Sequence, residues 1–261
     1  MITIKKSLIG ISVVASLALV VYYPGKLTLA DGPTLVQNPA DPLARGNFTS
    51  TLTRSFSSSV TIGNYIIVTI AAYRPEAFTF TISDNCGNTY TPAISQNYGN
   101  RTTYAIYYTK VTTTGACTVT ATSSGSNLQW NMEIAEFSGL DPTSPLDTTG
   151  QATGSGTGPT VNLTTSNPND LIVGVFGYGA TGTYTMTAGV GFTEYGKETT
   201  GAGYSSQLAE YKIVSNSGSQ TVDGTIGTSA TWYIVAAAFK AAGGAAPAPE
   251  YKRKQNIIWD E

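Results

Sequence analysis

The sequence predicts an all-β fold, a jelly-roll-like β-sandwich built from two tandem repeats of about 100 residues. After position 40, short apolar or alternating runs rich in Val, Ile, Thr and Tyr are separated by Gly, Asn, Asp and Pro. Helical periodicity is almost absent from this stretch. The runs also form two series that match each other in order. These observations together indicate strands rather than helices.

Each run is expected to form one strand. The first series comprises residues 65–73, 78–83, 102–112, 117–123 and 128–137, and the second comprises 171–178, 184–188, 206–214, 220–226 and 231–240. The glycine-rich residues 150–158 are expected to form a loop.

Two pairs of segments show the internal repeat most clearly. Residues 64–73 (NYIIVTIAAY) match 169–178 (NDLIVGVFGY), and residues 130–137 (WNMEIAEF) match 232–239 (WYIVAAAF). The small differences in spacing fall in turns, as expected when duplicated halves diverge. We therefore predict a duplication.

The predicted organisation has three parts. Residues 1–30 are a signal peptide or N-terminal anchor, 31–242 hold repeats 41–140 and 144–242, and 243–261 form a Gly/Ala/Pro linker and C-terminal tail. Strands that are apolar on both faces occur in both halves, and such strands lie at the centre of a stack of sheets. This favours one intertwined jelly-roll sandwich, with two separate immunoglobulin-like domains as the alternative.

Composition excludes several classes of function. The 261 residues include no histidine, and 14 Lys and Arg against 16 Asp and Glu give a formal net charge of −2. Histidine-based catalysis and imidazole metal sites are therefore ruled out. A nucleic-acid partner is not expected either, because it requires a basic patch. We predict a protein that is not an enzyme.

The N-terminus predicts export to the cell surface or the extracellular space. Lys5 and Lys6 precede an apolar run over 8–21, and residues 28–30 (TLA) offer a cleavage site before Asp31. An uncleaved anchor is the first alternative, and a pilin-type leader cut at Gly10 is the second.

Export affects the interpretation of the cysteines and of three glycosylation sequons. Cys86 and Cys117 are predicted to form a disulfide, because an oxidising compartment favours pairing of an even number of cysteines. Asn47, Asn100 and Asn162 each begin an Asn-X-Thr triplet and are the candidate glycan acceptors.

Several motifs resemble a known class of module. They are residues 130–147 (WNMEIAEFSGLDPTSPLD), 169–174, 191–193, 208–214 and the closing 232–240. Over residues 50–240 they resemble a β-sandwich module that is widespread in secreted and surface proteins of bacteria and has no assigned chemistry. The resemblance implies fold and location, and it transfers no active site. A looser architectural similarity is to archaeal extracellular filament subunits, which are joined by donor strands.

The carboxylates do not predict a catalytic pair. Glu133 and Glu136 differ by three positions on one predicted strand and so face opposite sides of the sheet. Glu194, Glu198 and Glu210 are expected to be solvated or locally paired. Glu133 differs because the matching residue in the second repeat is the apolar Val235. If Glu133 is buried, it needs a partner or a raised pKa.

No cofactor is expected, and calcium is the one ion for which suitable oxygen donors are present. These donors are Asp84, Asn85, Asn88, Asp141 and Asp147. They lack Asp-x-Asp-x-Asp spacing, and turn formation explains them without an ion.

Aromatic residues decide whether a sugar-binding surface is plausible. Trp130 and Trp232 occupy matching positions within apolar strands, which favours the core over an exposed platform. Tyr104, Tyr107 and Tyr108 could instead form an exposed aromatic face.

The sequence therefore predicts an exported structural or adhesive cell-surface protein, with a carbohydrate-binding surface module as the alternative. Its partners would be further copies of itself or the cell envelope, or else glycans. In a filament, one subunit would donate a strand to the next. The candidate donors are residues 31–37, including Asp31, Thr34, Leu35 and Val36, and residues 256–259, including Ile257, Ile258 and Trp259. For the C-terminal tail, the residues themselves favour a frayed terminus, with a docking segment as the alternative.

Overall fold

The computed structural model describes residues 32–39, 44–73, 78–99, 102–126, 128–180, 182–199 and 205–243. These residues form 17 β-strands and no helix. None of the described segments could therefore cross a membrane as a helix. The strands are β1 (Thr34–Gln37), β2 (Ala44–Thr49), β3 (Thr51–Ser55), β4 (Tyr65–Tyr73), β5 (Phe80–Asp84), β6 (Thr91–Tyr98), β7 (Thr102–Lys110), β8 (Thr118–Ser123), β9 (Leu128–Ser138), β10 (Leu146–Gly156), β11 (Thr160–Thr165), β12 (Leu171–Gly179), β13 (Met186–Ala188), β14 (Thr193–Glu198), β15 (Gln207–Ile213), β16 (Gly218–Ile226) and β17 (Ala230–Phe239).

The strands form four antiparallel sheets, two in each half of the chain. In the first half, a large sheet has the order β1-β9-β4-β7-β6, with β2 also on β9, and a small sheet has the order β3-β8-β5. In the second half, the large sheet is β10-β17-β12-β15-β14 and the small sheet is β11-β16-β13. The predicted all-β sandwich fold is confirmed. The two strand orders are those a duplication would give, but common descent of the halves stays a prediction.

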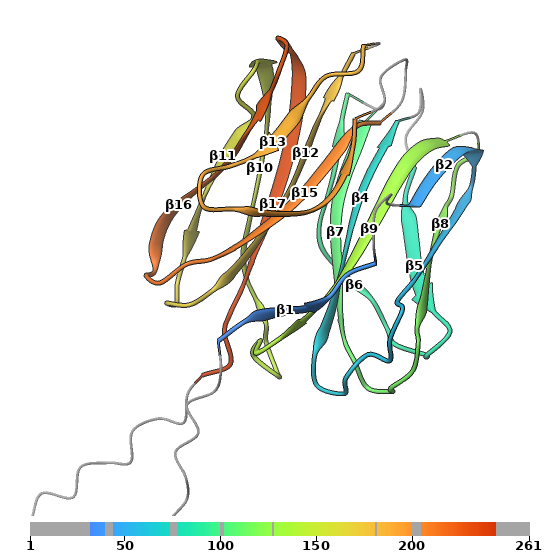
Figure 1. Cartoon of the computed structure of the whole chain (residues 1–261), viewed down its shortest axis with the longest axis vertical. Helices are drawn as coiled ribbons and strands as arrows, with labels where there is room; N and C mark the ends of the chain where they lie inside the picture. Colours follow the sequence, from blue (N-terminus) through green and yellow to red (C-terminus); the bar gives the residue numbers. More distant parts are fainter. Residues whose placement is uncertain are drawn as a thin grey trace, which may run out of the picture.

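The two halves lie side by side as four layers, with the large sheets in the middle and a small sheet on each outer side (Figure 1). No described sheet takes strands from both halves. The intertwined arrangement that the sequence analysis favoured is therefore wrong. The physical reason lies in strands such as β4. Ile66, Val68 and Ile70 face the core of the first sandwich, while Tyr65 and Ile67 face the second sandwich. Strands that are apolar on both faces are central here because two sandwiches stack.

The loop expected at residues 150–158 is wrong for residues 150–156, which belong to strand β10. Its residues Thr148–Gly156 pair with β17 without interruption, although they are mainly Gly, Thr and Ser. Packing explains the small residues, since a Cβ at Gly154 would lie 2.5 Å from the indole ring of Trp232. The ladder with β17 therefore sets the conformation, and the low strand propensity of glycine does not.

The predicted disulfide between Cys86 and Cys117 is confirmed. It joins the turn after β5 to the residue before β8, 31 positions along the chain. Replacing both cysteines by serine is expected to lower the free energy of unfolding by about 3–4 kcal/mol, because the unfolded chain gains freedom. Urea unfolding followed by tryptophan fluorescence measures this. An unchanged midpoint would contradict it.

Candidate functional site: the outer edges of the large sheets

The strand β1 places part of the predicted donor segment on the chain's own sheet. Leu35 pairs with Phe137 of β9 and packs against the apolar cluster between the sandwiches, while Val36 is 46% exposed. Thr34, Leu35 and Val36 thus belong to an edge strand formed within the chain. Asp31 and the tail residues Ile257, Ile258 and Trp259 lie outside the described residues.

Glu136 anchors β1 to the rest of the first half. Its fully buried carboxylate accepts hydrogen bonds from Gln37 Nε2 at 2.7 Å, from the Thr61 backbone N–H at 2.8 Å and from Asn64 Nδ2 at 2.6 Å. Three donors compensate for the lost hydration of a buried carboxylate. Glu136 is therefore a structural group that joins β1, a turn and β9.

The pairing of β1 and β2 along the edge of β9 leaves a gap between them. This gap explains why position 133 carries a carboxylate. β1 pairs with residues 136–138 of β9 and β2 pairs with 128–132, so no described strand pairs with Ile134 on this side. Glu133 Oε1 accepts the Ile134 backbone N–H at 2.9 Å and lies 3.0 Å from Arg54 Nε. The side chain of Glu133 thus replaces the missing strand. In the second half β10 is continuous here and pairs with Val235, so no carboxylate is needed.

The outer edges of the large sheets differ in how they are protected. Natural proteins blunt such edges with charges, prolines, bulges or short strands. β14 carries Glu194, Lys197 and Glu198 and has a bulge, β6 has Pro92 and a bulge, and β1 and β2 are short. In contrast, β10 has no charged residue or proline from Thr148 to Gly156. No described strand pairs with its outer side, so β10 is the least protected of these edges.

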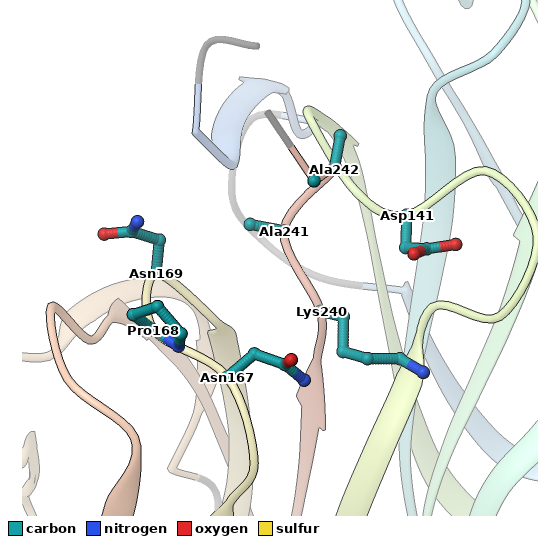
Figure 2. Close-up of a pocket in the computed structure, with 8 residues that line it drawn as sticks. Asp141, Asn167, Pro168, Asn169, Lys240, Ala241 and Ala242 are labelled. Atoms are coloured by element: carbon teal, nitrogen blue, oxygen red, sulfur yellow. The ribbon is translucent and has the colours of Figure 1, made fainter. Parts of the chain in front are cut away.

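A shallow pocket lies at the base of the sandwiches, where the end of β17 meets the turn before β12 (Figure 2). Asp141, Asn167 and Lys240 line its volume of about 250 Å³. Asp141 Oδ1 accepts the backbone N–H groups of Ser144 and Thr143, each at 2.9 Å, which hold the pKa of Asp141 below its usual range. The Asp141 carboxylate therefore stabilises the turn. It is the one carboxylate side chain among the residues that line this pocket, so the lining contains no pair of carboxylates.

The proposed calcium donors are engaged with protein groups. Asp84 accepts hydrogen bonds from the backbone of Cys86, from the backbone and side chain of Asn88 and from the Tyr90 hydroxyl. Asn85 Oδ1 accepts the Thr118 backbone N–H. The described residues contain no group of three or more His, Cys, Asp or Glu that could hold a metal.

Glu210 differs from the expectation of a solvated or locally paired carboxylate, and Asp170 is a second acid with a raised pKa. Glu210 is fully buried, and burial raises its pKa to about 8 although it accepts the Gly189 backbone N–H at 2.9 Å. Burial and the neighbouring Asp147 raise the pKa of Asp170 to about 7. Asp170 was not singled out from the sequence, because its position before a strand resembles any turn residue. Glu194, in contrast, forms the expected local pair with Lys197 at 2.8 Å.

The five aromatic residues singled out for a possible sugar-binding surface are buried or partly buried. Trp130 is 1% exposed and stacks on Phe80, and Trp232 is 8% exposed. Tyr104 and Tyr107 are buried and Tyr108 is partly buried. Trp130, Trp232, Tyr104 and Tyr107 therefore pack in the cores and not on an exposed face.

Two of the three candidate glycan acceptors, Asn47 and Asn162, lie among the described residues. Asn162 is exposed on β11, and its Oδ1 accepts the Thr221 hydroxyl at 2.8 Å. Asn47 has its backbone in β2, and Asn100 lies outside the described residues.

Comparisons with known proteins add no relative. No protein-family model matches the sequence, and no curated protein or solved structure is significantly similar to it.

Proposed function

We propose that this chain is an exported, non-enzymatic protein of the cell surface with a structural or adhesive role, and that copies associate by adding a strand to an open sheet edge. Export is supported by the leader-like residues 1–30 and by the disulfide. A structural role is supported by acids such as Glu133, Glu136 and Asp84, which form ion pairs and hydrogen bonds with other groups of the protein.

The outer edge of β10 is the observation that carries this proposal. An edge strand exposes backbone N–H and C=O groups that can pair with another chain. Over Thr148–Gly156 this edge is regular and uncharged, whereas the other outer edges of the large sheets are blunted. A donor segment of another copy would extend the sheet there by main-chain hydrogen bonds.

The C-terminal segment is the donor we favour. Residues 31–37 contain β1, which is already held on β9 by Leu35 and by the Gln37–Glu136 hydrogen bond. Residues 256–259 (NIIW) follow a linker rich in Gly, Ala and Pro and carry the apolar side chains that an added strand needs.

Charge on the β10 edge is expected to abolish association. The double variant Thr149→Lys, Gln151→Lys adds charge at two exposed edge positions, and opposed lysines resist pairing. Light scattering after size-exclusion chromatography should show assemblies for the wild type and monomers for this variant.

Two further variants complete the assembly experiment, one as a control for added charge and one as a test of the donor segment. Thr122→Lys adds charge at an exposed position of β8, which is paired on both sides, and should assemble normally. A chain ending at Gly243 should remain monomeric. Assembly of the double lysine variant at the wild-type level would contradict the proposed edge.

A further inference from the structure

Two carboxyl groups flank the end of β17, where the C-terminal segment leaves the second sandwich. β17 lies between β10 and β12, and its last residue, Phe239, pairs with Leu146 on one side and Leu171 on the other. Both leucines pack in the cluster between the sandwiches, so their chain neighbours Asp147 and Asp170 point to the opposite face of the sheet. There the two carboxyl groups come within hydrogen-bonding reach of each other.

The surroundings of Asp170 differ from those of the structural carboxylate Glu136, although both side chains are fully buried. Glu136 accepts three hydrogen bonds from protein donors, whereas neither carboxyl oxygen of Asp170 accepts one of normal geometry from a described group. Asp147 in turn accepts the backbone N–H and the hydroxyl of Ser166. A buried carboxylate without donors is costly, and a proton on Asp170 removes the charge and supplies a donor to Asp147.

The elements packed around Asp170 supply one further charged group, Lys240 at the end of β17. Lys240 and the Ala241 backbone both lower the pKa of Asp170, but burial, together with the hydrogen bond and charge of Asp147, raises it to about 7. Burial also acts on Asp147, but hydrogen bonds from Ser166 and Asp170 and the charge of Lys240 bring its pKa below the usual range. The two neighbouring acids therefore differ in their affinity for a proton, which is the behaviour of a coupled pair.

We propose that Asp147 and Asp170 form a pH-sensitive clasp, in which one shared proton holds the end of β17 between β10 and β12. With the proton bound, Asp170 donates a hydrogen bond to the Asp147 carboxylate and so joins the two strands that flank β17. When the proton is lost, two negative charges face each other, and that of Asp170 is shut off from water. Opening of the clasp lets water reach both charges and relieves the repulsion.

The part that opens is a short set of backbone hydrogen bonds at the exit of the C-terminal segment. The Lys240 N–H donates to the Pro145 carbonyl at 2.6 Å, and the Ala242 N–H donates to the Gly139 carbonyl at 2.7 Å. Figure 2 shows Lys240 and Ala242 on the segment that follows β17. These bonds tie the segment to the connection between the sandwiches, so their opening frees residues 240–243 while the sheets stay folded.

Amide hydrogen exchange of the full chain as a function of pH tests the proposal. Opening releases the proton of Asp170, whose ordinary pKa is 3.8 and whose pKa in the fold is about 7. After correction for the intrinsic pH dependence of exchange, the opening constant reported by the Ala242 N–H should rise by up to about tenfold per pH unit between about pH 4 and 7 and then level off. Equal opening constants at pH 5 and pH 7 would overturn the clasp.

Three variants assign the effect to the pair. Asp170→Asn should abolish the rise at Ala242, because asparagine cannot ionise and can still donate a hydrogen bond to Asp147. Asp147→Asn should move the upper end of the rise to lower pH, since Asp170 loses its negative neighbour. Glu210→Gln removes another buried acid of the same sandwich and should keep the rise. A rise that persists in Asp170→Asn, or disappears in Glu210→Gln, would contradict the assignment.

Carbon NMR of the aspartate carboxyl groups tests the shared proton in the unsubstituted protein, independently of how well the variants fold. The Asp170 signal should titrate near neutral pH, and the Asp147 signal should titrate below the usual range of an aspartate. Titration of Asp170 near pH 4, as for an ordinary solvated aspartate, would overturn the proposal.

Discussion

Replacing Arg54 by alanine is expected to lower the free energy of unfolding by about 3–5 kcal/mol, because it leaves the buried Glu133 carboxylate without its cation. Both side chains are almost inaccessible, at 6% and 0% exposure, and Arg54 also donates to the Pro39 carbonyl at 3.2 Å. Urea unfolding at neutral pH, followed by the fluorescence of the buried Trp130 and Trp232, measures the change.

A double variant distinguishes the loss of the pair from the loss of packing. Arg54→Met with Glu133→Leu removes both charges and keeps most of the volume, and it should cost only about 1–3 kcal/mol, since the Ile134 N–H loses its acceptor. A double variant as unstable as Arg54→Ala would show that electrostatics is not the reason for the loss.

The second large effect concerns pH. Burial raises the pKa of Glu210 to about 8, so the folded protein keeps a proton that the unfolded chain releases near pH 4.5. The unfolded state binds fewer protons in this window, so the free energy of unfolding should fall as pH rises from about 4.5 to 8, at up to about 1.4 kcal/mol per pH unit. Above the folded pKa the contribution is constant.

The variant Glu210→Gln isolates this contribution. Glutamine cannot ionise, so the variant should lose the share of the slope that Glu210 contributes and keep the share that Asp170 contributes up to about pH 7. It should be more stable than the wild type at pH 8.5. Glu198→Gln, on the neighbouring strand β14, is the matched control and should keep the wild-type slope. Parallel stability curves for Glu210→Gln and the wild type would contradict the burial argument.

Strands with strong apolar patterns could be predicted from the sequence. Residues 65–73 form β4 as expected, and the expected strand at 128–137 differs from β9 by one residue. β10 could not be found in this way, because Gly and Thr carry little local signal and its ladder with β17 is set by tertiary packing. The stacking of two sandwiches could not be predicted from the sequence either. Strands that are apolar on both faces fit one intertwined sandwich as well as two stacked sandwiches.

The candidate sites show a similar division. Pairing of Cys86 with Cys117 could be predicted from the even number of cysteines together with the predicted export, and the need of Glu133 for a partner could be predicted from its apolar counterpart. Arg54 could not be named as that partner, because it lies on β3 of the small sheet, far from Glu133 in the sequence. The approach of Asp147 to Asp170 depends on the register of β10 and β12 with β17, and no local pattern encodes it.

Negative-stain electron microscopy of the exported protein, without added ligand, tests the proposed function most directly. Wild-type chains should appear as regular filaments or ordered assemblies, and the double lysine variant of β10 should appear as single particles. Single compact particles for the wild type at all concentrations would contradict assembly through the β10 edge.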